Sequence, residues 1–202
     1  EIDRKKANEV IIKNHYSRKT YAGTFINLGI FIKDELNGVL QYGRLKNPAS
    51  YKKLIKNSTI DSVLDLNRMW ITDDAGEYPE SRAISCSIKF IKKKYPLTKI
   101  IQSFADERCG GFGIVYQACS FKYYGEHLTK FYELEGEVFH ELAVNNKGNG
   151  SRKITKREQW LKDNLHKAEC YELRQFRYIK ILSKRFNKEV LLKEQPYPKH
   201  YL

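Results

Sequence analysis

The stretch from residue 103 to residue 125 constrains the fold most, because it places a strand, a glycine-rich turn and a helix in direct succession. The apolar run at residues 100–104 predicts a buried strand that ends at Asp106. Three glycines then interrupt the backbone, and the pattern from Ile114 to Lys122 predicts a helix. This succession is typical of an α/β sheet, in which ligands bind beyond the carboxyl ends of the strands.

Two segments fit a phosphate loop. Residues 108–113 match R-x-x-G-x-G, which resembles the pyrophosphate loop of acyl-CoA-dependent acetyltransferases, but so short a pattern also fits a plain glycine turn, the interpretation we prefer. Residues 72–82 lead into a predicted helix whose free N–H groups can hold an anion, although Glu77 and Glu80 would repel it and suit the helix dipole. The residues that we expect to bind a cofactor are Thr72, Ser81, Arg82 and Gln117.

The composition predicts a globular protein with a full core, because 41% of the 202 residues are hydrophobic. No apolar run approaches the ~20 residues of a membrane span, so we expect no membrane partner. The four cysteines are scattered without a C-x-x-C pair, which indicates a reducing compartment and argues against a zinc site. The chain begins at Glu1 without a methionine, which leaves open a further strand before it.

The charge points to a polyanionic partner, since the net charge is +13 and the pI about 9.5. We expect that partner to be double-stranded DNA. Residues 147–199 hold fifteen Lys and Arg against six Asp and Glu, although a merely solvated basic face would have the same composition. The cations that we expect to contact phosphates are Lys147, Arg152, Lys153, Lys156 and Arg157.

The rest of the pattern completes a sheet. Two β-rich runs flank Asn37-Gly38 and predict a hairpin that turns at this dipeptide. Helices are predicted at residues 4–14 and 83–94 and around Trp160, strands at residues 63–71 and 178–182, and a strand or a hairpin at residues 131–144. We therefore expect an α/β fold with a mixed central sheet of about six strands and helices on both faces. It would form one domain of residues 1–202, with a basic C-terminal segment at about 146–202.

Several short segments occur in an order that resembles a known family. They are Asn14-His15-Tyr16-Ser17, Leu66-Asn67-Arg68-Met69-Trp70, Glu80-Ser81-Arg82, Ala105-Asp106, Tyr116-Gln117-Ala118 and Tyr124-Gly125. Together they cover roughly residues 7–125, and the end at residues 196–199 also fits. With this set the chain resembles the Mom family of phage DNA-modification proteins, which have a GNAT acyltransferase-like fold.

The resemblance implies an enzyme that adds a carbamoylmethyl (acetamido) group to the N6 amine of adenine in DNA. The modification shields phage DNA from restriction enzymes, which implies a place of action in the cytoplasm of a bacterial host. The site residues that the family implies are His15, Tyr16, Arg68, Asp106 and Tyr116. The acidic, proline-containing loop at residues 73–80 departs from an acetyl-CoA loop, which leaves the donor open between acetyl-CoA and another activated acyl or glycyl group. Iron has been considered for the family, and His15 is its one obvious ligand here.

The chemistry gives each of these residues a candidate role. We expect Asp106 to accept the proton of the amine and Tyr116 to donate a hydrogen bond, although Asp106 could instead cap the turn and Tyr116 fill the core. Arg68 could neutralise Asp106, hold the donor or point outward, and His15 could orient Tyr16 or act as a second base. The target base must leave the duplex. The aromatic residues that we expect to stack on it are Tyr123 and Tyr124, with Phe112 and Phe121 as further candidates.

Two other functions fit the same residues. The chain could be a GNAT N-acetyltransferase that acts on a protein, a tRNA or a small amine. It could also be a DNA-binding protein without catalytic activity. The set of Asp106, Tyr116 and Arg68 favours an enzyme, while the oligomeric state stays open.

Overall fold

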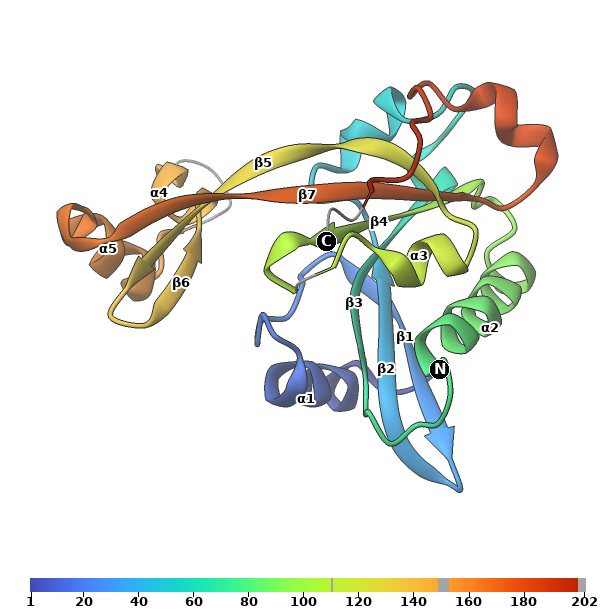
Figure 1. Ribbon diagram of the computed structural model, residues 1–202, viewed down its shortest axis with the longest axis horizontal. Coiled ribbons are helices and arrows are strands. Elements are labelled where there is room, and N and C mark those ends of the chain that lie inside the picture. Colours follow the sequence, from blue (N-terminus) through green and yellow to red (C-terminus); the bar gives the residue numbers. More distant parts are fainter. Residues whose placement is uncertain (110, 149–152, 200–202) are drawn as a thin grey trace.

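The computed structural model describes residues 1–109, 111–148 and 153–199, and a mixed sheet runs through it in the order β1-β2-β3-β4-β7-β5-β6 (Figure 1). The expected mixed α/β sheet is confirmed, with seven strands in these residues instead of about six. The strands are β1 (Thr24–Ile32), β2 (Glu35–Gly43), β3 (Val63–Ile71), β4 (Ile100–Asp106), β5 (Lys122–Leu134), β6 (Glu137–His140) and β7 (Glu169–Ile181).

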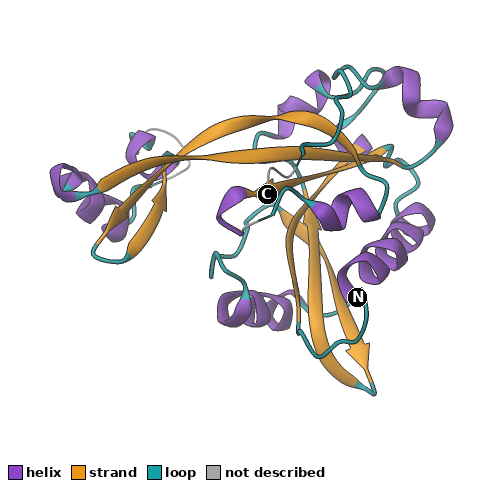
Figure 2. Cartoon of the chain, in the orientation of Figure 1, coloured by secondary structure: helices purple, strands orange, loops and turns teal. Residues whose placement is uncertain are grey.

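Helices cover both faces of the sheet, as expected (Figure 2). The helix α1 packs its buried Ala7 and Ile11 against β2 on one face, while α2 buries Ile84, Ile88 and Ile91 on the other. In the described residues, no helix is long and apolar enough to cross a membrane. The helices are α1 (Arg4–Asn14), α2 (Pro79–Lys94), α3 (Ile114–Ala118), α4 (Leu142–Asn145) and α5 (Lys156–Asp163), with short 3₁₀ turns at Pro48–Lys53, Ile60–Ser62, Glu107–Cys109, Leu165–Lys167 and Lys184–Glu189.

The β1–β2 hairpin exists, but its turn lies at Lys33-Asp34 and not at Asn37-Gly38. Lys33 and Asp34 have φ values of 49° and 65°, which is the left-handed geometry of a tight hairpin turn. Gly38 lies within β2, where a Cβ would come 2.8 Å from the carbonyl oxygen of Trp70. The glycine therefore permits close approach of two strands, and the sequence alone does not distinguish this from a turn.

The strands β3 and β4 are parallel, as the strand–helix–strand pattern predicts, but they pair over a short length. Val63–Asp65 pairs with Ile100–Gln102, and both strands continue beyond this ladder. The strands therefore separate toward their carboxyl ends. The helix α3 follows β4 and is shorter than predicted, because Ser120 at φ 57° turns the chain so that Lys122 starts β5.

The strands β5 and β7 form a long antiparallel ribbon that projects from the body of the molecule (Figure 1). We call the end of this ribbon, residues 126–175 as far as they are described, the arm. The hairpin expected at residues 131–144 is confirmed as part of it, and β7 begins nine residues before the predicted start at Tyr178. The tip has its own small core of Leu134, Phe139, Ala143 and Leu161.

We predict that Gly38→Ala lowers the free energy of unfolding by about 1–3 kcal/mol, because the added methyl group meets the Trp70 carbonyl. Asp34→Gly should change it by less than about 1 kcal/mol, since glycine adopts a positive φ without strain but loses more backbone entropy. Urea denaturation of both variants measures the difference. If Gly38 were not packed against β3, Gly38→Ala would meet no clash with the Trp70 carbonyl. An unchanged free energy of unfolding in Gly38→Ala would therefore contradict this hairpin.

Candidate active site

A cavity of about 420 Å³ opens where β3 and β4 separate. Its walls are the ends of these two strands, the start of α3 and the loop after α1, and we call it the split-strand pocket. The residues that the family resemblance implied all line it: His15, Tyr16, Arg68, Asp106 and Tyr116. Residues far apart in the sequence thus meet beyond the carboxyl end of a strand, which is where open α/β sheets bind ligands.

Asp106 ends β4, and its carboxylate is held by Arg108 rather than by Arg68. The Arg108 Nε lies 3.1 Å from Oδ1 and 3.0 Å from Oδ2, and its Nη2 lies 2.5 Å from Oδ2. Burial would raise the pKa of Asp106, but the hydrogen bonds and charge of Arg108 outweigh it, so the pKa is lowered and the group is ionised. The backbone N–H of Arg108 also donates to Oδ1 at 3.0 Å, so Asp106 caps the turn as well.

Arg108 was not among the predicted site residues, although it begins the R-x-x-G-x-G pattern. An arginine two residues after a carboxylate at a strand end was the signal that could have found it. Of the roles left open for Arg68, the neutralisation of Asp106 is not found, since Arg108 forms that ion pair. Arg68 donates to the carbonyl oxygens of Lys19 at 2.9 Å and Asn67 at 2.6 Å. It therefore ties the loop that carries His15 and Tyr16 to β3.

His15 is 6% exposed, and its Nδ1 accepts the backbone N–H of Ser17 at 3.1 Å. Burial, followed by the charges of Arg68 and Arg108, lowers the pKa of His15 to about 4. The ring is therefore neutral near pH 7, and with Nδ1 as acceptor its proton is on Nε2. In this tautomer His15 is a hydrogen-bond donor, which does not suit the expected role of a second base.

No group of three or more His, Cys, Asp or Glu in the described residues is arranged to hold a metal ion. The split-strand pocket offers Asp106, His15 and Cys109, but Asp106 is occupied by Arg108 and the His15 Nδ1 by Ser17. These residues do not fit an iron site, and we derive no step through iron.

Two tyrosines face the pocket in their protonated forms. Tyr16 is 55% exposed, and its hydroxyl lies 3.4 Å from Asp106 Oδ2, so burial of the hydroxyl and the charge of Asp106 raise its pKa. Tyr116 is buried against Phe121 and Tyr178, with ring centroids 5.5 Å apart in both pairs. Burial raises the pKa of Tyr116 to about 12. Both hydroxyls are hydrogen-bond donors near pH 7.

The four residues expected to bind a cofactor do not line this pocket. The backbone N–H of Thr72 donates to the Asn37 carbonyl, and the Ser81 hydroxyl donates to the Tyr78 carbonyl at 3.1 Å. The Gln117 amide donates to Tyr178 at 3.0 Å and to the Phe112 carbonyl at 3.3 Å, so it fastens the turn before α3.

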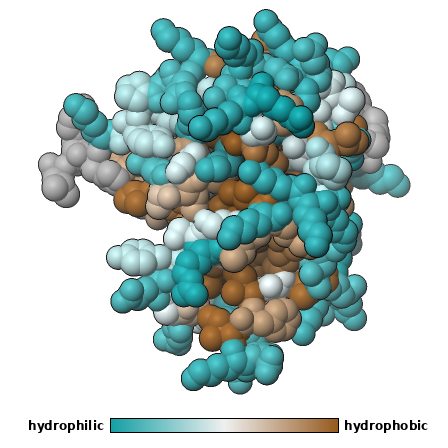
Figure 3. Space-filling model, turned by 90° about the vertical axis from the view of Figure 1, so that its right-hand side faces the viewer, coloured by the Kyte–Doolittle hydropathy of each residue, from teal (hydrophilic) through white to brown (hydrophobic). Residues whose placement is uncertain are grey.

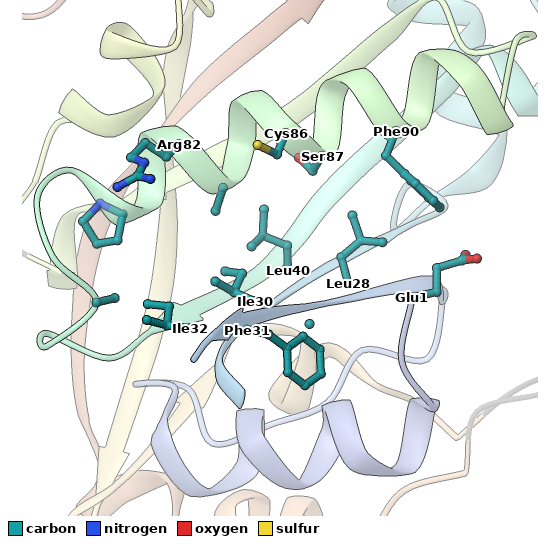
Figure 4. A pocket seen from close by; sticks show the side chains of 14 residues that line it. Glu1, Leu28, Ile30, Phe31, Ile32, Leu40, Arg82, Cys86, Ser87 and Phe90 are labelled. Carbon is teal, nitrogen blue, oxygen red and sulfur yellow. The ribbon is translucent and has the colours of Figure 1, made fainter. Parts of the chain in front are cut away.

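The remaining one, Arg82, stands at the rim of a second cavity of about 480 Å³ between α2 and the β1–β2 hairpin (Figure 4). Leu28, Ile30, Leu40 and Phe90 form its walls. Figure 3 shows apolar side chains gathered in a hollow on this side of the molecule. The residues that line this second cavity hold no acid paired with a base, in contrast to the split-strand pocket.

The prediction that Tyr123 and Tyr124 stack on a base is wrong. They are 5% and 8% exposed and pack in two different core clusters. A bulge in β5 between Tyr123 and Glu126, with Gly125 at φ 87°, allows two consecutive tyrosines to point inward. Phe121 is fully buried too. In the pocket it is Tyr16 that offers an exposed ring.

Four of the five cations expected to contact DNA are exposed around the tip of the arm, namely Lys147, Lys153, Lys156 and Arg157. Arg152 lies outside the described residues. Arg157 forms an ion pair with Glu137 and lies over the Phe139 ring. Arg108 links the pocket to the arm, because it holds the pocket residue Asp106 and its guanidinium lies 4.1 Å from the centre of the Phe131 ring.

Comparison with known proteins identifies relatives of the whole chain. The model of the Mom protein family matches residues 1–199. Methylcarbamoylase mom of Escherichia phage Mu is 42% identical over 197 residues, which cover 96% of this chain and 80% of the phage protein.

Solved structures are less similar. An N-acetyltransferase from Staphylococcus aureus Mu50 has 15% identity and a TM-score of 0.43, over 77% of this chain and 66% of its own. A protein of Streptococcus mutans UA159 has 12% identity and a TM-score of 0.47, over 88% of this chain and 95% of its own. Similarity at this level carries no argument about activity.

We predict that His15 lowers the free energy of unfolding as the pH falls from about 6.5 to about 4, because it takes up a proton in the unfolded chain and not in the folded one. Buried Asp65, whose pKa is raised to about 7, acts in the opposite direction over this range, so the contribution of His15 is the difference between the variant and the original protein. His15→Gln should make this dependence shallower. It should not abolish it, since burial also lowers the pKa of His140 to about 4. Urea denaturation at a series of pH values measures the slope. Equal slopes for the variant and the original protein would show that His15 titrates normally.

Proposed function

Because the chain belongs to the Mom protein family, we propose that it transfers a carbamoylmethyl group to the N6 amine of adenine in double-stranded DNA. The observation that carries the proposal is the split-strand pocket, where an ionised carboxylate stands beside two protonated tyrosines. The basic arm next to the pocket supplies a surface for DNA. The product would shield phage DNA from restriction enzymes inside the bacterial host cell.

The reaction requires a base, since the N6 lone pair is delocalised into the adenine ring. The N6 nitrogen attacks the methylene carbon of an activated carbamoylmethyl donor, a carbon–nitrogen bond forms, and the bond to the leaving group breaks. Asp106 takes the proton that the amine loses. Tyr116 donates a hydrogen bond toward the charge that develops on the donor, and His15 Nε2–H can do the same.

The target adenine must leave the base stack, at a cost of a few kcal/mol. Tyr16 is placed to stack on it, because its ring is exposed at the pocket and its hydroxyl points at Asp106.

Within one functional unit of residues 1–202, the basic segment at about 146–202 would hold the phosphates. The donor must carry its leaving group on the methylene carbon. A glycyl-type donor activated there meets this requirement, whereas an acyl donor attacked at its carbonyl carbon would leave an amide on N6. Arg82, near the start of α2, is a cation of the expected phosphate loop.

Mass spectrometry of nucleosides tests the function. DNA is isolated from bacteria that express the protein, digested and compared with DNA from cells without it. A peak of carbamoylmethylated deoxyadenosine is the expected result. An acetylated amine in protein, tRNA or small molecules, with normal DNA, would instead indicate an N-acetyltransferase. DNA binding without any modified product would indicate a binding protein, and either result overturns the proposal.

We predict that Asp106→Asn and Tyr116→Phe each lower the rate of adenine modification by roughly 10²-fold or more, the scale of losing an acid or a base. Both changes are nearly isosteric, and neither removes a positive charge, so both variants should fold and bind DNA. Melting temperature and modified nucleoside are measured in the same preparations. Normal modification per folded molecule by Asp106→Asn would remove Asp106 from the mechanism.

We predict that DNA affinity falls by orders of magnitude between low and moderate salt. Replacing Lys147, Lys153, Lys156 and Arg157 together by glutamine should weaken binding to all sequences alike and flatten the salt dependence. A control with Lys89, Lys92, Lys93 and Lys94 of α2 replaced removes the same charge from another part of the molecule. Equal losses in the two variants would mean that the arm is not the DNA surface.

A further inference from the structure

The carboxylate of Asp106 is fully engaged in this structure. Oδ1 accepts the backbone N–H and the Nε of Arg108, while Oδ2 accepts Nε and Nη2 and faces the Tyr16 hydroxyl. A carboxylate offers about four lone-pair sites, and all are in use here. Asp106 cannot accept a proton from an amine until some of these donors leave.

Arg108 is the donor best placed to leave. Its side chain is 27% exposed, against 6% for Asp106, and it borders the arm that carries the exposed cations. The guanidinium lies over the Phe131 ring of β5 at 4.1 Å and is 5.3 Å from the Tyr16 ring. These aromatic contacts fix the plane of the guanidinium. Its N–H groups stay free to leave the carboxylate and donate to another anion, such as a phosphate.

A nucleotide that swings out of a duplex brings its phosphates along, and the arginine fork binds phosphate in the same two-pronged way as carboxylate. We propose that a DNA phosphate beside the extruded adenosine draws Arg108 off Asp106, and that the carboxylate becomes a base only when substrate is bound. Arg108 is then a substrate-binding residue and the cover of Asp106. This inference rests on the proposed function and adds how the base is switched on.

The chain supplies a matched control in the next residue. Glu107 is held by Arg174 through hydrogen bonds of 2.8 Å from the backbone N–H, 3.0 Å from Nε and 2.6 Å from Nη2. Arg174 also lies over aromatic rings, those of Phe112 and Phe176. Neither Glu107 nor Arg174 lines the split-strand pocket. The same chemistry is thus present twice, once with a carboxylate that lines the pocket, Asp106, and once with a carboxylate that does not, Glu107.

The first test is binding to a short DNA duplex with an unpaired adenine. Asp106→Asn frees Arg108 and should tighten binding by about tenfold, the scale of one charge-assisted contact. Glu107→Gln removes the same charge and should change binding by less than about twofold. In an Arg108→Gln background, Asp106→Asn should lose its effect. Equal tightening by Asp106→Asn and Glu107→Gln, or tightening that persists without Arg108, overturns the proposal.

Thermal unfolding of each preparation shows whether the variants fold. If Arg108→Gln does not fold, Arg108→Lys takes its place, since a lysine keeps the charge without the two-pronged fork. The tightening by Asp106→Asn should then shrink in the lysine background. An unchanged tenfold effect there would contradict an exchange between carboxylate and phosphate.

The second test is the pH dependence of modification between about pH 7 and pH 5. Without Arg108 on it, the buried Asp106 has a higher pKa, so kcat, which reports the bound enzyme, should decline toward pH 5. The value of kcat/KM reports the free enzyme, where Arg108 lowers the pKa of Asp106, and should show no decline that comes from Asp106. In Arg108→Gln both should decline, and in Arg174→Gln the original pattern should remain.

The other titratable groups that interact directly with Asp106 do not change charge in this range. Burial raises the pKa of Asp65, which does not line the pocket, to about 7, so any effect of Asp65 is shared by kcat and kcat/KM and the difference between the two profiles is the readout. Burial lowers the pKa of two nearby histidines, His15 and His140, to about 4. Burial raises the pKa of the hydroxyls of Tyr16 and Tyr171 and of the Cys109 thiol. Parallel profiles of kcat and kcat/KM in the original protein would overturn the proposal. DNA left without any modification by the original protein would instead count against the proposed function.

Discussion

The separation of β3 and β4 is the constraint on which the rest of this structure depends. Three residue pairs join the two parallel strands, after which each continues with its own neighbours. The space between them is the split-strand pocket, and Asp106 lies at its edge because β4 ends there. Gly113 closes the turn behind Asp106 with φ 79°, where a Cβ would come 2.4 Å from the Tyr178 ring. The end of β4 and the turn that follows it thus determine where the Asp106 carboxylate lies.

The second structural element is the arm, which brings charge to a pocket that the sheet has already formed. Its ribbon of β5 and β7 is anchored beside β4, and its tip has a separate small core, so the exposed cations stand on a supported surface. Phe131 of the arm touches Arg108, and Arg108 holds Asp106. A short chain of contacts therefore joins the surface proposed for DNA to the group proposed as the base.

The sequence predicted the order of the elements well, because strand and helix periodicities and the strand–helix–strand pattern are local signals. The family segments brought five residues to one pocket, which periodicity alone could not do. The predictions were wrong at positions whose structure depends on tertiary contacts. Gly38 allows two strands to approach closely instead of forming a turn, and a bulge in β5 buries both Tyr123 and Tyr124. Arg108 was missed because its pairing depends on how the turn after Asp106 folds back.

The most direct measurement is a crystal structure of the protein with a DNA duplex that carries an unpaired adenine. We predict that the adenine occupies the split-strand pocket, with its N6 atom within about 3 Å of a carboxylate oxygen of Asp106 and Tyr16 against the base. An adenine that stays stacked in the duplex, or that binds in the apolar cavity between α2 and the β1–β2 hairpin, would contradict it.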